Sequence, residues 1–381
     1  MFQKTSNIKL SPIKEMELRA SKIPGVVSLA QGIPSFDTPE SIKQKAIEAI
    51  EKGRVAKYSL SPGIPELREA IEESLASDGM FYDFDSEIII TAGAIEAITA
   101  TLITILEPND EVLIPSPTYT SYQEAIKVAG GKPVFVDLIE EESWAFSIKN
   151  FEQKISSHTK AIFFCNPNNP TGTIYTKKQL LTLAELAKKY NLYIITDEVY
   201  KDFIYTDEEF FSLAQVPELR KRIIRIFSFS KSHSMTGWRV GFVHSDSTII
   251  KEILKIHDSL ITCAPVVSQY AALGALETDE NIIDYYNQKY LKRRKLICDR
   301  LDNLKNVFSY QKPNSSYFVF PKYNLEKDSK TFSIDLLEKA LVTVVPGIAF
   351  GPNGEGHVRM SFGRTSDDIN KAFDRMEKYF K

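Results

Sequence analysis

A lysine that follows an apolar run is the first residue in this sequence with a clear chemical use. Residues 222–229 form a hydrophobic run that predicts a buried strand, and Lys231 lies just past its end. In open α/β sheets, ligands bind at this end of the strands. A desolvated amine near another cation loses its proton easily and becomes a nucleophile toward aldehydes. Since a lysine after a strand can also be an ordinary surface residue, its neighbours decide between the two interpretations.

Two neighbours of Lys231 can bind a phosphate group. Ser228 precedes it by three residues and offers a hydroxyl, and Arg239 follows it by eight residues and offers a guanidinium fork. A lysine for an aldehyde, with a hydroxyl and an arginine for a phosphate, indicates pyridoxal 5′-phosphate (PLP) in Schiff-base linkage.

Polar side chains that fit the rest of this cofactor follow two other predicted strands. Asp197 comes after the strand at residues 192–196, and a carboxylate there can pair with the pyridine nitrogen. Tyr200 can donate to the 3′-oxygen of the ring. Asn169 lies in a turn with two prolines after the strand at residues 161–165, and its amide can donate to a phenolate or carboxylate oxygen.

An apolar strand that ends in Asp-Glu also occurs in P-loop ATPases. That interpretation requires a G-x-x-x-x-G-K-[ST] motif, which is absent from the sequence, and no G-x-G-x-x-G fingerprint follows a strand. The sequence therefore excludes both nucleotide-binding classes.

Three further features gain a function only in this context. Gly93-Ala94-Ile95 opens a predicted helix whose free N–H groups form an anion site, although any helix start has such groups. Tyr119 follows a predicted strand and can stack on a flat ring or simply pack. Arg359 is a charge within a half-buried strand pattern, so it needs either a substrate carboxylate or a structural ion pair.

The elements that must position these residues alternate between strand and helix. We predict strands at residues 88–90, 112–114, 134–138, 161–165 and 192–196. We predict helices at residues 95–106, in the segment that ends at 130–131, and at 176–190, followed by two long helices at about 248–260 and 281–304 with little between them. This alternation predicts an α/β fold with a mostly parallel sheet flanked by helices. Short strands mixed with helices after residue 306 predict a smaller α+β domain. We expect an N-terminal arm and part of the small domain in residues 1–44, the large PLP-binding domain in residues 45–280, and the C-terminal small domain in residues 281–381.

Composition limits the partners and the compartment. A net charge of −3 gives no electrostatic footprint for nucleic acid, and no apolar run is long enough to span a membrane. Cys165, Cys263 and Cys298 are few and far apart, so they form neither a disulfide framework nor a zinc site. The histidines include no ligand pair at metal-binding spacing. We expect a cytoplasmic protein with no metal ion.

In their order along the chain, these motifs resemble those of class I/II PLP-dependent aminotransferases of fold type I, in the branch of aspartate and aromatic aminotransferases. The resemblance covers nearly the whole chain, and the residues that carry it are Gly32, Tyr58, Gly93-Ala94-Ile95, Tyr119, Asn169-Pro170-Thr171-Gly172, Asp197-Glu198-Val199-Tyr200, Ser228-Phe229-Ser230-Lys231, Arg239 and Arg359. It implies a transaminase of amino-acid metabolism. The enzyme would move an amino group from an aromatic or acidic L-amino acid to a 2-oxo acid such as 2-oxoglutarate.

The resemblance also implies a role for each of these residues toward the cofactor. Lys231 carries PLP and moves the substrate proton, and Asp197 binds the pyridine nitrogen. Asn169 and Tyr200 bind the 3′-oxygen, and Tyr119 stacks on the ring. The residues implied to bind the phosphate are Gly93, Ala94, Ile95, Ser228 and Arg239.

Substrate binding and assembly follow from the same resemblance. Arg359, Asn169 and the backbone at Gly32 would bind the α-carboxylate. Tyr58 would reach the phosphate in the neighbouring subunit, which predicts a homodimer with shared active sites. The sequence assigns no arginine to a distal carboxylate.

One local departure and two alternatives stay open at this stage. Relatives usually have a glycine-containing turn where this chain has Ser315-Ser316, and we expect a change in pocket shape there. A PLP-dependent lyase on the same scaffold, acting on cystathionine or forming a cyclopropane ring, would use most of these residues. A PLP-sensing transcription regulator would need a basic helical pair before the large domain, and the N-terminal 40 or so residues show none.

Overall fold

A seven-stranded sheet forms the centre of the molecule. The computed structural model describes residues 8–277 and 281–381. The strand order is β2-β8-β7-β6-β5-β3-β4, and every neighbouring pair is parallel except those that involve β8. The strands are β2 (Ile88–Thr91), β3 (Glu111–Ser116), β4 (Lys132–Asp137), β5 (Thr159–Cys165), β6 (Tyr193–Asp197), β7 (Ile223–Ser228) and β8 (Gly241–His244).

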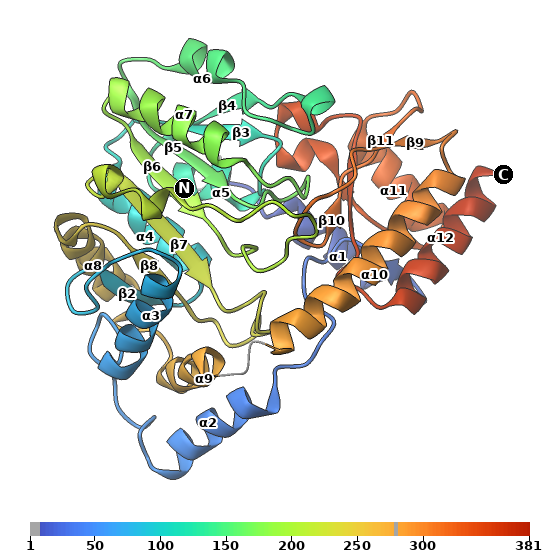
Figure 1. The fold of residues 1–381 in the computed structure, drawn as a ribbon. Helices are drawn as coiled ribbons and strands as arrows, with labels where there is room; N and C mark the ends of the chain where they lie inside the picture. The colour runs from blue at the N-terminus through green and yellow to red at the C-terminus, as the bar shows by residue number, and fades with distance from the viewer. Residues whose placement is uncertain (1–7, 278–280) are drawn as a thin grey trace, which may run out of the picture.

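Helices cover both faces of this sheet because its inner strands are apolar on both sides (Figure 1). In β5, Phe163 packs into the core on one face and Phe164 into the core on the other. The first core includes side chains of α4 (Ala94–Ile105), α5 (Ser121–Val128) and α8 (Ser247–Ile261). The second includes side chains of α2 (Glu40–Glu51), α3 (Pro65–Ser77), α6 (Ile148–Lys154), α7 (Lys177–Lys189) and α9 (Val266–Leu276). The predicted α/β class with a mostly parallel sheet is confirmed.

The C-terminal part forms a smaller α+β unit at the right of Figure 1, where α10 and α12 run side by side. Its helices are α10 (Asn281–Asn303), α11 (Ser329–Lys339) and α12 (Ser366–Phe380). Its strands are β9 (Phe308–Ser309), β10 (Phe318–Val319), β11 (Lys322–Tyr323), β12 (Val342–Thr343), β13 (Val345–Pro346) and β14 (Val358–Ser361). Where the domains divide along the chain stays a prediction.

The N-terminal segment joins this smaller unit. Strand β1 (Val27–Ser28) pairs in parallel with β12, and helix α1 (Pro12–Ala20) packs through Met16 and Ala20 against Leu337 of α11. The N-terminal and C-terminal segments of the chain therefore pack together. Residues near both ends of the sequence can contribute to one site.

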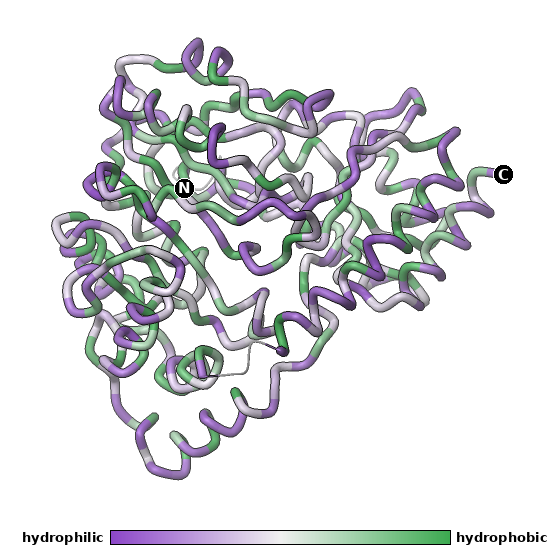
Figure 2. The backbone as a smooth tube through the Cα atoms, viewed as in Figure 1, coloured by the Kyte–Doolittle hydropathy of each residue, from purple (hydrophilic) through white to green (hydrophobic). Residues whose placement is uncertain are grey.

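Local sequence explains where several elements begin and how they pack. Thr176 and Gln179 form a reciprocal capping box at the start of α7. Along the helices around the sheet, hydrophilic and hydrophobic residues alternate, as expected for helices with one buried face (Figure 2). Within the described ranges, none of the helices combines the length and apolarity needed to cross a bilayer. The described residues also include the short 3₁₀ segments η2 (Glu140–Glu142), η3 (Leu213–Gln215), η4 (Pro217–Leu219), η5 (Gly347–Phe350) and η6 (Pro352–Gly354).

Candidate active site

A cavity of about 480 Å³ opens where three parallel strands end. Cys165, Asp197 and Ser228 are the last residues of β5, β6 and β7, and all three line the cavity. Eleven of the thirteen residues predicted from the sequence line it as well: Gly32, Ala94, Ile95, Tyr119, Asn169, Asp197, Tyr200, Ser228, Lys231, Arg239 and Arg359. The fold thus brings together segments that lie more than 300 residues apart.

Lys231 lies three residues past the end of β7 and is partly buried. Its Nζ donates a hydrogen bond to the carbonyl oxygen of Gly32 at 2.8 Å. Burial lowers the pKa of this amine to about 8, the positive charges of Arg359 and Arg239 act in the same direction, and Asp197 opposes them. A much larger fraction of this amine is therefore neutral near pH 7 than for an exposed lysine.

Asp197 is a buried carboxylate that accepts hydrogen bonds from two protein groups. The hydroxyl of Tyr122 donates to Oδ2 at 2.7 Å, and the backbone N–H of Val199 donates to Oδ1 at 3.3 Å. Burial raises the pKa of Asp197 to about 6, and these two hydrogen bonds hold it below the value that burial alone would give. The carboxylate is mostly ionised at neutral pH, so a cationic N–H in the cavity fits it.

Arg359 is fully buried in β14, more than 100 residues after Lys231 and Arg239 in the sequence. It donates to Oδ1 of Asn169 at 3.0 Å and to the carbonyl oxygen of Ala30, and its guanidinium lies 4.4 Å from the ring centroid of Phe318. Burial lowers the pKa of Arg359 to about 10. Within the described residues it forms no ion pair with a carboxylate, so the structural ion pair considered above is not present.

Asn169 connects this arginine to Tyr200. Its Nδ2 donates to the hydroxyl of Tyr200 at 3.4 Å, while its Oδ1 accepts from Arg359. The side-chain amide is therefore fixed in one orientation, with its nitrogen toward the tyrosine and its oxygen toward the arginine.

The part of the cavity lined by Ser228, Arg239 and the start of α4 carries groups that can bind an anion. Ser228 Oγ donates to the carbonyl oxygen of Val240 at 3.0 Å, and Arg239 donates to the carbonyl oxygen of Ala92 at 3.1 Å. Gly93 is the N-terminal cap of α4 and has φ of 82°. A Cβ at this position would lie 2.4 Å from Nη2 of Arg239, so the close approach requires glycine. Gly93 does not line the cavity itself, but it holds Arg239 beside the N–H groups at the start of α4.

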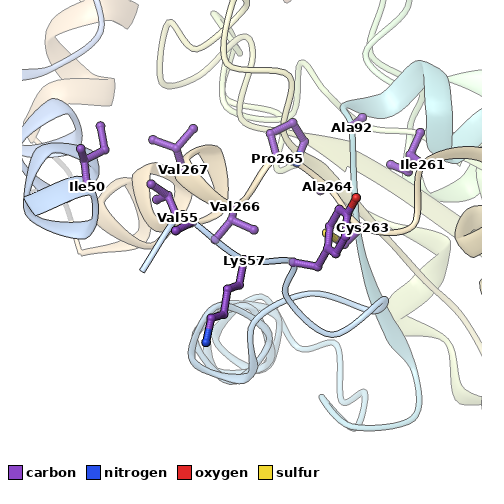
Figure 3. A pocket seen from close by; sticks show the side chains of 12 residues that line it. Ile50, Val55, Lys57, Ala92, Ile261, Cys263, Ala264, Pro265, Val266 and Val267 are labelled. Carbon is purple, nitrogen blue, oxygen red and sulfur yellow. The ribbon is translucent and has the colours of Figure 1, made fainter. Parts of the chain in front are cut away.

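Tyr119 and Tyr58 lie in different places. Tyr119 lines the cavity, with its ring centroid 5.4 Å from that of Tyr122. Tyr58 is 83% exposed and lines a separate, open groove of about 1120 Å³ on the same chain. Figure 3 shows this groove, with Lys57 and Val266 among its labelled residues. The groove is mostly apolar, and its lining includes Ala92, next to the anion-binding turn.

Sequence reasoning missed several lining residues. Tyr122 lies in the first turn of α5, three residues after Tyr119, and Ser230 lies within a motif already identified, so both could have been considered from the sequence. Ile13, Lys14 and Glu17 come from α1, and no local signal in the sequence connects that helix with the cavity.

The departure at Ser315-Ser316 lies outside the cavity lining. Ser315 donates through its hydroxyl to the carbonyl oxygen of Gly172 at 2.8 Å. Ser316 has φ of 56°, in the left-handed region that favours glycine, which explains why a glycine-containing turn suits this place. An effect on the cavity can pass through the turn at residues 169–172 or through the two residues that follow Ser316, since Tyr317 donates to the carbonyl oxygen of Gly32 at 3.1 Å and Phe318 lies against Arg359.

The buried carboxylate, the amine of lowered pKa and the anion site fit the pyridine ring, the aldehyde and the phosphate of PLP. Fold and site together define a PLP-dependent transaminase. The chain belongs to the family "Aminotransferase class I and II", whose model matches residues 24–376.

Named relatives and solved structures agree with this assignment. The chain is 40% identical to an aspartate aminotransferase of Pyrococcus horikoshii, over 97% of this chain and 95% of that protein. It is 38% identical to the aromatic-amino-acid aminotransferase 2 of Thermococcus litoralis, over 97% of this chain and 96% of that protein. The crystal structure of an aspartate aminotransferase from Thermotoga maritima superimposes with a TM-score of 0.92 at 36% identity and covers 99% of both chains.

Proposed function

We propose that this enzyme transfers the amino group of an aromatic or acidic L-amino acid to a 2-oxo acid such as 2-oxoglutarate, with Lys231 as the catalytic residue. The observation that carries the proposal is the Lys231 amine, whose pKa is lowered to about 8 in the cavity that also holds Asp197 and Arg359. The names of similar proteins, which include aspartate and aromatic aminotransferases, support this choice of substrates.

Specific residues would hold the cofactor. Asp197 would accept the pyridinium N–H, Asn169 and Tyr200 would bind the 3′-oxygen, and Tyr119 would cover the ring. The proposed phosphate-binding residues are Gly93, Ala94, Ile95, Ser228 and Arg239. When bound, PLP supplies an electron sink that stabilises negative charge at the substrate Cα.

The chain's own residues would perform the proton transfer and orient the substrate. The neutral Lys231 amine takes the proton from Cα, and proximity lets one amine act first as base and then as acid. Arg359 would bind the α-carboxylate, with Asn169 and the backbone at Gly32 beside it. A Cβ at Gly32 would lie 2.7 Å from the Phe318 ring, so only glycine lets the backbone approach this closely.

The experiment is a donor panel. Aromatic and acidic amino acids are each incubated with the PLP-loaded protein, with and without 2-oxoglutarate, and both oxo-acid and glutamate are measured. Glutamate formed in step with the donor's oxo acid supports transamination. Oxo acid that continues to accumulate without an acceptor, beyond one equivalent per site, would instead identify a lyase. Amino transfer from none of these donors would overturn the proposal.

A homodimer with shared sites is the second part of the proposal. Tyr58 is 83% exposed and lines a groove whose other residues are mostly apolar. Val55, Ile261 and Val266 are among them (Figure 3). Apolar surface of this kind is normally covered by a partner. Because the groove adjoins the turn before Gly93, a second copy bound in a two-fold arrangement would bring Tyr58 toward the partner's phosphate site.

Complementation tests the shared site. Tyr58→Phe and Lys231→Ala chains, once shown to exchange subunits, should form mixed dimers with one intact site, and activity should exceed that of the separate samples. A mixture of Lys231→Ala with Asp197→Asn is the matched control, since both defects stay in their own chains and no site is intact. A gain equal to the control, or a monomer in sedimentation, would contradict the shared site.

We also propose a cytoplasmic location. Cys165, Cys263 and Cys298 are all free thiols, which suits a reducing compartment. Retention of the protein with periplasmic or secreted markers after cell fractionation would contradict this.

A further inference from the structure

Four cationic side chains line the active-site cavity, and three of them have partners in the proposed function. Lys231 is the catalytic amine, Arg239 faces the phosphate and Arg359 faces the α-carboxylate. The fourth, Lys14 of α1, is exposed at the cavity and has no assigned use. In the described parts of the chain, it takes part in no ion pair.

Helix α1 is held in place at the cavity. Ser11, just before the helix, lies at hydrogen-bond distance (3.2 Å) from Thr120 at the start of α5. On the opposite side, Glu17 accepts hydrogen bonds from Ser28 at 2.6 Å and from Gln31 at 2.8 Å. Lys14 is therefore carried by an anchored helix rather than by a free arm.

Neither carboxylate of α1 forms an ion pair with Lys14 in the described structure, and Glu15 pairs with Arg19 and Lys330 instead. Both oxygens of Glu17, one turn along the helix, are engaged by Ser28 and Gln31. Asp197, the other carboxylate that lines the cavity, has hydrogen bonds from Tyr122 and Val199 at the end of β6. A positive charge at the cavity without a protein partner favours an anionic group on the ligand.

Part of the cavity wall is apolar. Ile13, Ile33, Ile95 and Ile98 line the same cavity, and Ile33 and Ile95 are 37% and 41% exposed there. The side chain of a substrate whose α-carboxylate binds Arg359 would lie along such a wall. An aromatic side chain would need only the isoleucines, whereas a side chain that ends in a carboxylate needs a cation.

We propose that Lys14 is a specificity-determining residue that binds the distal carboxylate of dicarboxylic substrates, namely aspartate, glutamate and their 2-oxo acids. This inference rests on the proposed function and specifies its substrate class. The sequence assigned no cationic residue to a distal carboxylate, and Lys14 of α1 would be that residue. One cavity would then accept both substrate types, because the aromatic ring and the carboxylate use different parts of it.

The test compares Lys14, which lies within α1, with Lys22, which lies just past its end. Lys14→Met keeps the length of the apolar stem and removes the charge, and Lys22→Met is the control because Lys22 is exposed just past α1 and does not line the cavity. For each variant, KM and kcat are measured with aspartate, 2-oxoglutarate, phenylalanine and phenylpyruvate. Binding of succinate and of propionate to the PLP-loaded enzyme is measured by the change in cofactor absorbance.

Lys14→Met should raise KM for aspartate and 2-oxoglutarate, and Kd for succinate, by about fivefold, the effect expected for one partly solvated ion pair. Values for phenylalanine, phenylpyruvate and propionate should stay as in the wild type, and Lys22→Met should change none of them. Added salt should weaken succinate binding to the wild type more than to Lys14→Met.

An equal loss for all substrates, or no change for the dicarboxylates, would overturn the role of Lys14. Absence of amino transfer in the wild-type protein is a different result, because it would contradict the proposed function itself. Propionate and succinate binding can still be compared in that case, so the two failures are distinguishable.

Discussion

The floor of the cavity and its mouth differ in how their side chains are held. On the floor, Asp197, Asn169 and Arg359 are buried, and protein groups fix each of them through at least two hydrogen bonds. At the mouth, Lys14 is exposed and its amine forms no hydrogen bond or ion pair in the described structure, and the apolar side chain of Ile95 is exposed as well. The floor is preorganised for one chemistry, whereas the mouth leaves room for different ligands.

This difference indicates where each property of the enzyme resides. Groups that must stabilise charge at the reacting atoms need fixed positions in a water-poor site. Groups that distinguish substrates need only contribute a contact to a side chain that varies. Substitutions on the floor should therefore affect all substrates, and substitutions at the mouth should affect some of them.

The largest effect is expected for Lys231→Ala. Loss of the amine proposed to move the Cα proton should lower kcat by about 10²- to 10⁴-fold or more for every substrate. PLP should still bind, but without a covalent bond that borohydride reduces. An unchanged melting temperature of the apoprotein serves as the control for folding, and kcat near that of the wild type would remove Lys231 from this role.

Asp197→Asn should have the next largest effect. An amide keeps the shape of the side chain but cannot stabilise a pyridinium, and a charge-assisted hydrogen bond alone contributes about 1.5–3 kcal/mol. We expect kcat to fall by at least about 10- to 100-fold for aromatic and acidic donors alike. A loss confined to one donor class would contradict the contrast between floor and mouth.

Arg359→Lys should weaken all substrates without selecting among them. A lysine retains the charge but cannot make the forked contact with a carboxylate, so KM should rise by about tenfold for amino acids and 2-oxo acids of both classes. Steady-state kinetics with phenylalanine and aspartate measure this. If only aspartate is affected, Arg359 binds the distal rather than the α-carboxylate.

Tyr122→Phe should produce a smaller change with a defined pH dependence. The Tyr122 hydroxyl favours the ionised form of Asp197, whose pKa burial raises to about 6. Its removal should raise that pKa further. Asp197 accepts a hydrogen bond from the pyridinium N–H only in its ionised form. PLP affinity should therefore fall as the pH drops below the pKa of Asp197.

Titration of apoprotein with PLP from pH 5 to 8 measures the shift. The fall in affinity should begin at higher pH in Tyr122→Phe than in the wild type. Tyr175→Phe is the matched control, because Tyr175 is also buried but does not line the cavity. The same pH profile in all three proteins would contradict the role of Tyr122, and the smallest effects are those described above for Lys14→Met.

Much of the sheet and of the floor could be predicted because both leave local signals. Buried strands such as β5 and β6 are short apolar runs, and Asp197 follows one of them directly. Helix α9 was missed because it is largely apolar on all sides, packed between α2 and α3, and so lacks the hydrophobic stripe that marks a surface helix. Strand β8, four residues long, follows Arg239 almost at once and was not recognised.

The mouth could not be predicted because it depends on tertiary contacts alone. Lys14 lines the cavity because two long-range contacts place its helix there. Strand β1 pairs with β12, and Ser11 contacts Thr120, which lies more than 100 residues further along the chain. The role proposed for Tyr58 likewise depends on a second copy of the chain. Such long-range placements carry no local pattern in the sequence.

Borohydride reduction of the PLP-loaded wild-type protein, followed by proteolysis and mass spectrometry, tests the central claim most directly. The floor geometry predicts that a single peptide carries the reduced pyridoxyl group and that the modified residue is Lys231. Amino-acid substrate added before the reduction should prevent the labelling. Modification of any other lysine, such as Lys57 or Lys14, with Lys231 unlabelled would contradict the assignment of the catalytic residue.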